Sequence, residues 1–478
     1  MNKEYGKFLV PNMTMARKRI NKDTNIVRYR LNSLYKGLGE GKHYHIKTYG
    51  CQGNLADSEK IRGIVEALGY KYVNEDKNAD LIIFNTCAIR ENAENRVFGE
   101  LGRIKNLKKV NPNLIMAICG CMPQEENVVN KIKTKYPQVD IVFGTHNIHK
   151  IDEYLYEAVV NKNKVIEVFS FEGDIVEDVP VIRDHNKKAW VNIMYGCDEF
   201  CTYCIVPYTR GKERSRMPED IINEVKGLAE EGYLEVTLLG QNVNAYGNDF
   251  TNRKYTFANL LEDLSNTDIK RIRFTTSHPR DLDDETIKVM GKGGNIMPHL
   301  HLPVQSGSDY ILKRMNRKYT KEEYLEKVRK LKETVPGIAI TTDIIVAFPG
   351  ESEEDFNETL DLVSKAEFEG AFTFIYSPRE GTPAATYQND LTEDEKKERL
   401  LTLNKHINDG YYKGNKRFEG MVVKVLVDGV SSKNNEILTG YTEHNKVVNF
   451  AGDKSLIGTI VDVKIEKAFS WHLRGKLV

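Results

Sequence analysis

Seven cysteines are the residues of this 478-residue chain whose type and spacing could do chemistry. Their number is odd, and the first twenty residues carry charges throughout and lack the apolar stretch of a secretion signal. Thiols stay reduced inside the cell, so disulfides are a poor explanation. We therefore expect metal binding or catalysis. The cysteines are Cys51, Cys87, Cys119, Cys121, Cys197, Cys201 and Cys204.

The strongest pattern is Cys197-x3-Cys201-x2-Cys204, within YGCDEFCTYCIVPY. Three thiolates within eight residues can wrap one small polynuclear cluster, and they leave one iron of a 4Fe-4S cube without a protein ligand. An open iron can bind a small molecule through an amino and a carboxylate group. The alternative is a zinc knot, which normally needs four nitrogen or sulfur ligands in paired spacing. No second pair lies nearby, so we expect a cluster.

Three other cysteines share a second pattern. Cys51, Cys87 and Cys121 each follow a short apolar, strand-like run (HYHIKTY, ADLIIFN and LIMAIC) and precede a polar, helix-like stretch. Ligands at the carboxyl ends of parallel strands converge on one crevice, which predicts a second three-cysteine site with an open iron. The alternative is three buried structural cysteines. Cys119 precedes a turn at Gly120, and we interpret it as a core residue.

These cysteines require an α/β scaffold. Residues 43 to about 160 alternate strand and helix patterns, which indicates a parallel α/β domain. Residues 185 to about 410 contain six strand–helix units, which suit a partial (β/α)6, TIM-like barrel with its active site at the carboxyl ends of the strands. After about residue 413, short alternating strands without helices predict a small OB-like β-barrel. The six barrel strands are expected in WVNIMYG, EVTLLG, RIRFTTS, HLHLPVQ, IAITTDIIVAF and FTFIYS.

Several polar residues follow the predicted barrel strands, where they could bind amino, carboxylate and ribose groups of a cofactor. His278 also lies there, although the adjacent Pro279 allows it simply to cap a loop. The candidate cofactor-binding residues are Gln241, Asn242, Ser277 and Gln305, which follow strands, and Asp343, which lies within the fifth strand.

The charge is balanced overall but unevenly distributed. The chain has 69 Lys+Arg and 69 Asp+Glu, yet residues 1–42 hold ten bases against three acids and residues 413–478 hold eleven against seven. We expect a flexible basic arm over 1–42, an acidic linker over 166–182 and nucleic-acid contacts by the C-terminal module. The alternatives are a solvated arm, an edge strand near residue 170 and an inert barrel whose aromatics form its core. Those aromatics are Tyr441, Phe450, Phe469 and Trp471.

The Cys-x3-Cys-x2-Cys loop resembles the radical S-adenosylmethionine superfamily, in which the open iron chelates the methionine part of S-adenosylmethionine. The resemblance implies that Cys197, Cys201 and Cys204 hold the catalytic cluster, and that Tyr203 lies near the adenine. Together with TYGCQGNLADSE, NTCAIR, GCMPQ, LLGQNVNAYG, LHLPVQSGSDYILKRMNRKYT and TDIIVAFPGESEEDF, the chain resembles the methylthiotransferase family from residue 43 to its end. The family pattern CQMN is CQGN here, with Gly53 in place of Met.

The family resemblance implies five segments: a basic extension (1–42), an N-terminal methylthiotransferase domain (43–165), a linker (166–182), a radical S-adenosylmethionine domain (183–412) and a TRAM RNA-binding domain (413–478). It implies two 4Fe-4S clusters, with Cys51, Cys87 and Cys121 holding the auxiliary one, and S-adenosylmethionine as cofactor. The basic loop RGKERSR is expected to contact RNA backbone or cofactor, or to be a solvated turn. Its cations are Arg210, Lys212, Arg214 and Arg216.

The motifs around the first two cysteines resemble the tRNA branch of the family. This implies methylthiolation at C2 of N6-dimethylallyladenosine beside the anticodon, with a reductant protein such as flavodoxin or ferredoxin as partner. Two alternatives are methylthiolation of threonylcarbamoyladenosine in tRNA or of a ribosomal-protein aspartate, and a third is a non-catalytic iron–sulfur protein. No apolar run reaches membrane-spanning length, so we expect no membrane partner. Because the start also lacks the apolar stretch of a signal peptide, we expect a cytoplasmic location. We further expect a monomer.

Overall fold

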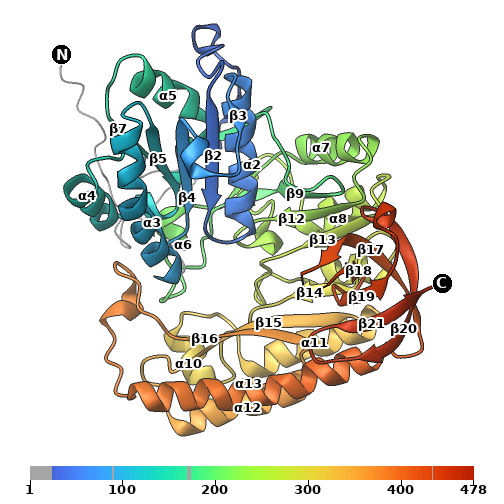
Figure 1. The fold of residues 1–478 in the computed structure, drawn as a ribbon. Coiled ribbons are helices and arrows are strands. Elements are labelled where there is room, and N and C mark those ends of the chain that lie inside the picture. Colours follow the sequence, from blue (N-terminus) through green and yellow to red (C-terminus); the bar gives the residue numbers. More distant parts are fainter. Residues whose placement is uncertain (1–23, 89–90, 169–173, 433) are drawn as a thin grey trace.

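The computed structural model describes residues 24–88, 91–168, 174–432 and 434–478. Figure 1 shows an N-terminal α/β domain above an open barrel of parallel strands, with a small β-barrel packed at its side. The three parts are those expected from the alternation of apolar residues. No helix among the described residues is long and apolar enough to cross a membrane.

The N-terminal domain is a six-stranded parallel sheet with order β3-β2-β4-β5-β6-β7. Helices α2 and α5 cover one face and α3 and α4 the other, so the central strand LIIFNT is buried on both sides. The order reverses between β2 and β4, which is where ligand crevices form. The elements are β2 His43–Thr48, α2 Gln52–Ala67, β3 Lys71–Tyr72, β4 Leu81–Thr86, α3 Glu91–Val110, β5 Ile115–Gly120, α4 Glu126–Lys135, β6 Ile141–Phe143, α5 Ile151–Val159 and β7 Val165–Glu167.

Two expectations about the flanking segments were wrong. Part of the predicted flexible arm forms β1 (Ile26–Arg28), which pairs in parallel with β8 (Ile175–Glu177) inside the predicted linker. The predicted linker also begins too early, because β7 is the edge strand of the sheet up to Glu167. Arg28 also bonds to Asp178, which follows β8, and to Asp220 of α7 (Pro218–Glu230). Residues 1–23 of the arm lie outside the described residues.

The central domain has six parallel barrel strands in two three-stranded sheets, β13-β12-β9 and β14-β15-β16. A bridge between Ile272 and Ile296 joins the halves, and β9 and β16 do not pair, so the barrel is open. Its elements are β9 Lys188–Asn192, α6 Val206–Thr209, α7 Pro218–Glu230, β12 Glu235–Leu239, α8 Phe257–Ser265, β13 Arg271–Phe274, α9 Asp284–Gly291, β14 His299–His301, α10 Asp309–Arg314, α11 Lys321–Thr334, β15 Ala339–Val346, α12 Glu353–Ala366, β16 Gly370–Ile375 and α13 Glu393–Lys416, with the hairpin β10 Met194–Tyr195 and β11 Arg214–Ser215.

The C-terminal module is a closed barrel with order β17-β18-β19-β21-β20. Phe450 lies in its core, so the expectation that this ring could stack on a base was wrong. Trp471 is 63% exposed. The strands of this module are β17 Val422–Ser431, β18 Asn434–Thr442, β19 Val447–Ala451, β20 Ile460–Ala468 and β21 Leu473–Leu477.

Short 3-10 helices occur throughout the described residues. They are η1 Ser33–Tyr35, η2 Asp76–Asn78, η3 Met122–Gln124, η4 Thr145–Lys150, η5 Val243–Ala245, η6 Pro383–Thr386 and η7 Lys454–Leu456.

Two buried arginines fix the C-terminal module to the central barrel. Arg271 of β13 is 2% exposed and donates to the carbonyls of Tyr441 and Lys424. Arg273 of the same strand donates to the carbonyls of Glu443 and Thr442. Hydrogen bonds from a charged guanidinium to carbonyls are stronger than neutral ones. The module is therefore a fixed wall beside the open barrel.

Candidate active site

The Cys197–Cys204 loop follows the first barrel strand and is held by backbone bonds. The amide of Cys197 donates to the carbonyl of Gly211 at 3.1 Å, and the side chain of Asn316 donates to the carbonyls of Glu199 and Phe200. The loop leaves the strand at Gly196, whose φ is 81° and where a Cβ would lie 1.8 Å from the carbonyl oxygen of Lys212. Glycine is therefore required at this turn.

The three N-terminal cysteines meet at the crevice where the strand order reverses. Cys51 is the N-cap of α2, and Cys87 and Cys121 follow β4 and β5. Burial, opposed by the Arg210 guanidinium and reinforced by the neighbouring thiols of Cys87 and Cys51, raises the pKa of Cys121 to about 12. A Cβ at Gly50 would lie 2.8 Å from Cβ of Cys87. Proximity of all three thiols is what the spacing predicted.

A buried hydrogen-bond network joins the loops that carry these cysteines. Asn54 of α2 donates to the carbonyl of Thr86 at 3.0 Å, and Asn85 returns a bond to the carbonyl of Asn54 at 2.8 Å. The hydroxyl of Thr86 bonds to the carbonyl of Cys119 at 2.6 Å. Cys119 itself packs in the hydrophobic core beneath α2.

The thiol geometry tests what the two triads can bind. Among the described residues, the one group of three or more candidate ligands whose atoms all lie within 4.8 Å of one another is Glu199, His278 and Asp281. In neither cysteine triad do all three sulfur atoms lie within 4.8 Å of one another. Thiolates that bind a single zinc ion would lie about 3.8 Å apart. Each triad supplies three thiols, which is the number that an iron–sulfur cube with one open iron takes from a protein.

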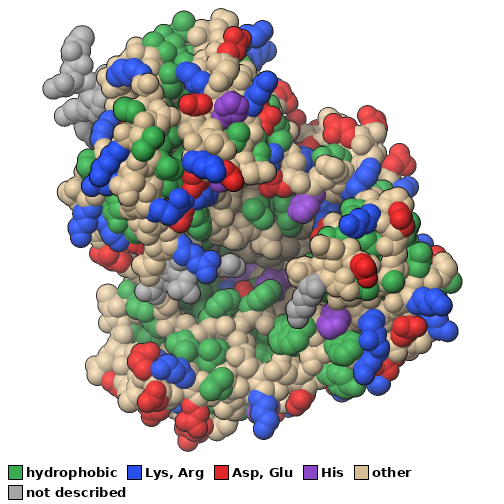
Figure 2. All heavy atoms as spheres, in the orientation of Figure 1, with side chains coloured by type: hydrophobic (Ala, Val, Ile, Leu, Met, Phe, Trp, Pro, Cys, Tyr) green, Lys and Arg blue, Asp and Glu red, His purple; other side chains and the backbone are tan. Residues whose placement is uncertain are grey.

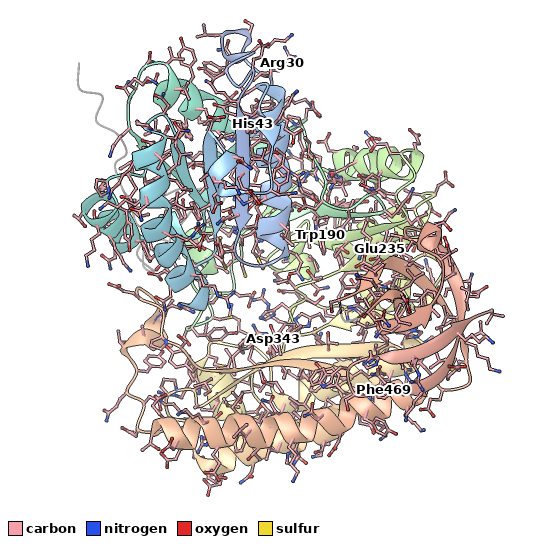
Figure 3. All side chains as sticks on the ribbon, viewed as in Figure 1. Arg30, His43, Trp190, Glu235, Asp343 and Phe469 are labelled. Carbon is pink, nitrogen blue, oxygen red and sulfur yellow. The ribbon has the colours of Figure 1, made fainter. Side chains whose placement is uncertain are left out.

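A cavity of about 560 Å³ connects the N-terminal domain, the open barrel and the C-terminal module. Cys51 and Gly53 line it from α2, Gln241 from the end of β12, and Trp471 from the C-terminal module. Hydrophobic side chains gather along this hollow in Figure 2, and Figure 3 places Asp343 of β15 beside it. One cavity therefore joins Cys51 to the barrel strands.

The predicted cofactor residues separate into two groups. Gln241 and Asp343 line the cavity; Gln241 accepts the amide of Gly196 at 2.6 Å, and Asp343 lies 3.4 Å from His301. Gln305 is buried next to Asp343 with φ 72°, and Tyr203 packs edge-on against Phe348.

Asn242 and Ser277 form the second group. Both are buried, and the Asn242 side-chain oxygen and the Ser277 hydroxyl have no hydrogen-bond partner among the described residues. Neither lines the cavity. The amide of Asn242 donates to Asp281 at 2.6 Å, which places it beside His278 rather than at the cavity wall.

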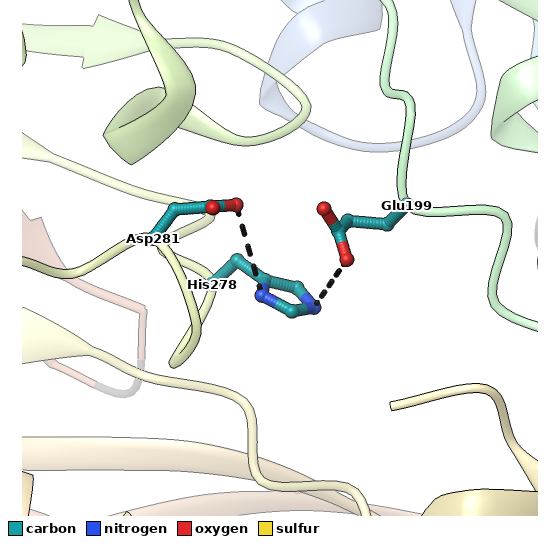
Figure 4. A group of neighbouring side chains, drawn as sticks. All are labelled: Glu199, His278 and Asp281. Atoms are coloured by element: carbon teal, nitrogen blue, oxygen red, sulfur yellow. Dashed lines mark ion pairs between the residues drawn. The ribbon is translucent and has the colours of Figure 1, made fainter. Parts of the chain in front are cut away.

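His278 stands between two carboxylates, as Figure 4 shows. Its Nε2 lies 3.6 Å from Glu199 and its Nδ1 lies 3.9 Å from Asp281. Arg280 pairs with both acids, and burial together with nearby cations lowers the pKa of His278. Arg280 already supplies positive charge to the two carboxylates, so no metal ion is needed to balance them. We interpret the group as a structural support for the cysteine loop rather than as a metal site. Sequence reasoning missed Glu199, although its position inside Cys-x3-Cys was a signal.

The basic loop does not form the expected exposed RNA-binding surface. Arg210 pairs with Asp57 at 2.7 Å, and Arg216 pairs with Glu177 and Glu224. Arg214 is 8% exposed and donates to the carbonyl of Arg210, while Lys212 is half-buried. Unpaired buried cations are costly, and the partners of Arg210 and Arg216 include acids of other segments, Asp57 and Glu177. Contact of this loop with RNA backbone or cofactor therefore stays a prediction, and the burial of the three arginines does not favour it.

Another buried arginine lies beside the triad of Cys197, Cys201 and Cys204. The guanidinium of Arg317 lies 3.5 Å from the sulfur of Cys201 and donates to the carbonyl of Pro303 and the hydroxyl of Tyr319. Arg317 lies after α10 in the MNRKYT segment, 116 positions from Cys201. Because the two residues are so far apart in sequence, their spacing did not predict this contact.

Comparison with known proteins agrees with this geometry. The Radical SAM superfamily profile matches residues 191–363, that of Uncharacterized protein family UPF0004 matches 43–144, and the TRAM domain profile matches 416–478. In fold, the chain is similar to the radical S-adenosylmethionine methyltransferase TsrM from Kitasatospora setae, with a TM-score of 0.53 and 12% identity over 72% of this chain and 75% of that one. Fold and cysteine loop define a radical S-adenosylmethionine enzyme.

Sequence relatives narrow the class. A tRNA-2-methylthio-N(6)-dimethylallyladenosine synthase of Anoxybacillus flavithermus is 56% identical over 98% of this chain and 90% of the relative. The protein of that description from Bacillus subtilis is 56% identical over 100% of this chain and 95% of the relative. The chain belongs to the family of tRNA-2-methylthio-N(6)-dimethylallyladenosine synthases.

Proposed function

We propose that this chain converts N6-dimethylallyladenosine next to the anticodon of tRNA into its 2-methylthio derivative. The observation that carries the proposal is the second cysteine triad, whose Cys51 lines the same cavity as Gln241 at the end of the second barrel strand. Adenine C2 carries an unactivated C–H bond with no leaving group, so polar side-chain catalysis is inadequate. The bound clusters and S-adenosylmethionine supply the one-electron chemistry that side chains lack.

The residues present fit two clusters. Cys197, Cys201 and Cys204 would hold the cluster that binds S-adenosylmethionine, and Cys51, Cys87 and Cys121 would hold the auxiliary cluster. Each triad leaves one iron position open. For S-adenosylmethionine itself we propose contacts from the six residues of the strand ends and the cysteine loop: Tyr203, Gln241, Asn242, Ser277, Gln305 and Asp343.

The cavity suits a prenylated base. On β16, Phe372 and Phe374 point to the same side of the strand, line the cavity and are 63% and 45% exposed. Aromatic rings that are exposed inside a concave site are typical of a ligand-binding site. We propose that they contact the dimethylallyl group. A loop base that is splayed out of the anticodon enters at modest cost.

We propose that the C-terminal module binds the tRNA backbone. Arg474 and Lys467 lie over the ring of Phe469, and the neighbouring cations on the same strands are exposed. Phosphate contacts of this kind give salt-dependent affinity without sequence preference. The exposed cations of β20 and β21 are Lys464, Lys467, Arg474 and Lys476.

Other parts of the proposal follow from the substrate and the chemistry. A tRNA substrate places the enzyme in the cytoplasm, and a one-electron step requires a reductant protein such as flavodoxin or ferredoxin. We propose that the enzyme acts as a monomer, with domain boundaries near residues 43, 183 and 413.

The test is a reaction of the reconstituted enzyme with S-adenosylmethionine, reductant and tRNA that carries N6-dimethylallyladenosine, followed by nucleoside digestion and mass spectrometry. We expect the 2-methylthio nucleoside to form. Parallel reactions contain tRNA with threonylcarbamoyladenosine, or the ribosomal protein. Product in either of those reactions, with none on the prenylated tRNA, would overturn the proposal.

A further inference from the structure

Arg210 reaches from the radical S-adenosylmethionine domain into the auxiliary cysteine site. It follows α6 of the central domain, yet its Nε lies 3.2 Å from the sulfur of Cys121. Its Nη2 donates to Asp57 of α2 at 2.7 Å, and its side chain is only 7% exposed. A buried cation with a fixed carboxylate partner thus points one N–H at a cluster ligand.

The carboxylate holds the guanidinium in place rather than replacing the sulfur contact. Asp57 is 3% exposed and takes one end of the planar fork, while Nε remains directed at Cys121. At Gly53, a Cβ would lie 3.6 Å from the Cys51 sulfur and 4.0 Å from Nη2 of Arg210. The absence of a side chain there leaves the space beside the guanidinium and Cys51 open.

We propose that Arg210 is a positioning residue that sets the reduction potential of the auxiliary cluster. This inference rests on the proposed function, which assigns a cluster to Cys51, Cys87 and Cys121. Reduction adds one negative charge to a cluster, and a fixed cation stabilises the reduced form in surroundings of low dielectric. Hydrogen bonds to ligand sulfur and local net charge are the features by which proteins adjust cluster potentials.

The same contact links the auxiliary site to the docking of the two domains. Arg210 and Asp57 lie on opposite sides of the domain boundary, so the surroundings of the auxiliary cluster are complete only when α2 and the central barrel are packed together. An ion pair elsewhere on that boundary, between Arg62 of α2 and Asp184, does not touch a cysteine. It offers a matched control.

The experiment compares wild type, Arg210→Gln, Arg210→Lys and the control Arg62→Gln as full-length proteins with both clusters reconstituted. Iron and sulfide are counted, and the clusters are titrated with reductant and followed by electron paramagnetic resonance. The auxiliary signal is the one that a Cys87→Ala variant lacks. We expect Arg210→Gln to shift the midpoint potential of the auxiliary cluster to a more negative value. Arg210→Lys keeps the positive charge, so its midpoint potential should return most of the way to the wild-type value. Arg62→Gln should match wild type.

An unchanged midpoint in Arg210→Gln at full iron content would overturn the inference. So would an equal shift in Arg62→Gln, which would indicate a general effect of domain packing, or loss of iron in Arg210→Gln that Arg210→Lys does not restore. Failure of the proposed function is distinguishable, because wild type would then hold only about four irons per chain.

Discussion

The two cysteine triads reach similar arrangements by opposite routes. Cys197, Cys201 and Cys204 lie in one eight-residue loop, whereas the auxiliary cysteines come from three separate strand ends. A buried arginine lies beside each triad: Arg317, from the same domain, beside the first, and Arg210, from another domain, beside the second. The local site depends on one loop, and the auxiliary site depends on the packing of two domains.

The largest expected effect separates the two triads by their products. Cys201→Ala should abolish both 5′-deoxyadenosine formation and methylthiolation, because S-adenosylmethionine loses its cluster. Cys87→Ala should still form 5′-deoxyadenosine and give no methylthio nucleoside. Chromatography of the nucleosides and cofactor products measures both. Methylthio product from Cys87→Ala would remove the distinction between the sites.

The cavity lined by Cys51 and the barrel strands gives the next prediction. Phe372→Ala should raise the KM for prenylated tRNA by about tenfold, since one apolar contact with the dimethylallyl group is lost. Steady-state kinetics with prenylated and unprenylated tRNA measure it, and the difference between the two substrates should shrink. Tyr310→Ala, at an exposed ring outside the cavity, is the control. Equal losses in both variants would count against the assignment.

The domain boundary that completes the auxiliary site should be sensitive to pH. Glu59 of α2 is buried against Arg183 and Asp184, and burial raises its pKa to about 7 from an ordinary 4.5. Because the folded state holds the proton more tightly, this stabilisation is complete below pH 4.5 and is lost as pH rises through 7. Glu59→Gln should remove about 3 kcal/mol of that pH dependence.

Denaturant unfolding between pH 5 and 8 measures this effect. Glu59→Gln keeps an oxygen that can accept from the amide of Asp184, so its curve should be flatter than that of wild type. The exposed Glu230→Gln on α7 should run parallel to wild type. A Glu59→Gln curve as steep as that of wild type would assign the pH dependence to other groups.

The smallest effect concerns two glycines of α2. A Cβ at Gly53 would meet nothing closer than 3.6 Å, so Gly53→Ala should stabilise the helix by about 0.5 kcal/mol through its propensity. A Cβ at Gly63 would lie 1.9 Å from the carbonyl oxygen of Pro180, so Gly63→Ala should destabilise the domain boundary. Thermal unfolding compares them. Equal shifts of Tm would contradict this account of the helix surface.

Sequence patterns predicted the parts of the fold that depend on local periodicity. The six barrel strands, the N-terminal parallel sheet and the closed C-terminal barrel follow from alternation and from apolar runs such as LIIF. The convergence of Cys51, Cys87 and Cys121 also followed, because parallel strand ends share one edge.

Contacts between side chains that are distant in sequence could not be predicted from those patterns. Arg210 and Arg216 belong to a basic run that is typical of an exposed loop, and only the acids of other segments, Asp57 and Glu177, explain their burial. The pairing of β1 with β8 depends on residues about 150 positions apart. Glu199 and Asp281 likewise meet at His278 from separate loops.

Iron and acid-labile sulfide counts test the central claim most directly, that this chain holds two clusters at two triads. Reconstituted wild type should contain about eight irons per chain, and Cys87→Ala and Cys201→Ala about four each. About four irons in wild type, left unchanged by Cys87→Ala, would contradict the account.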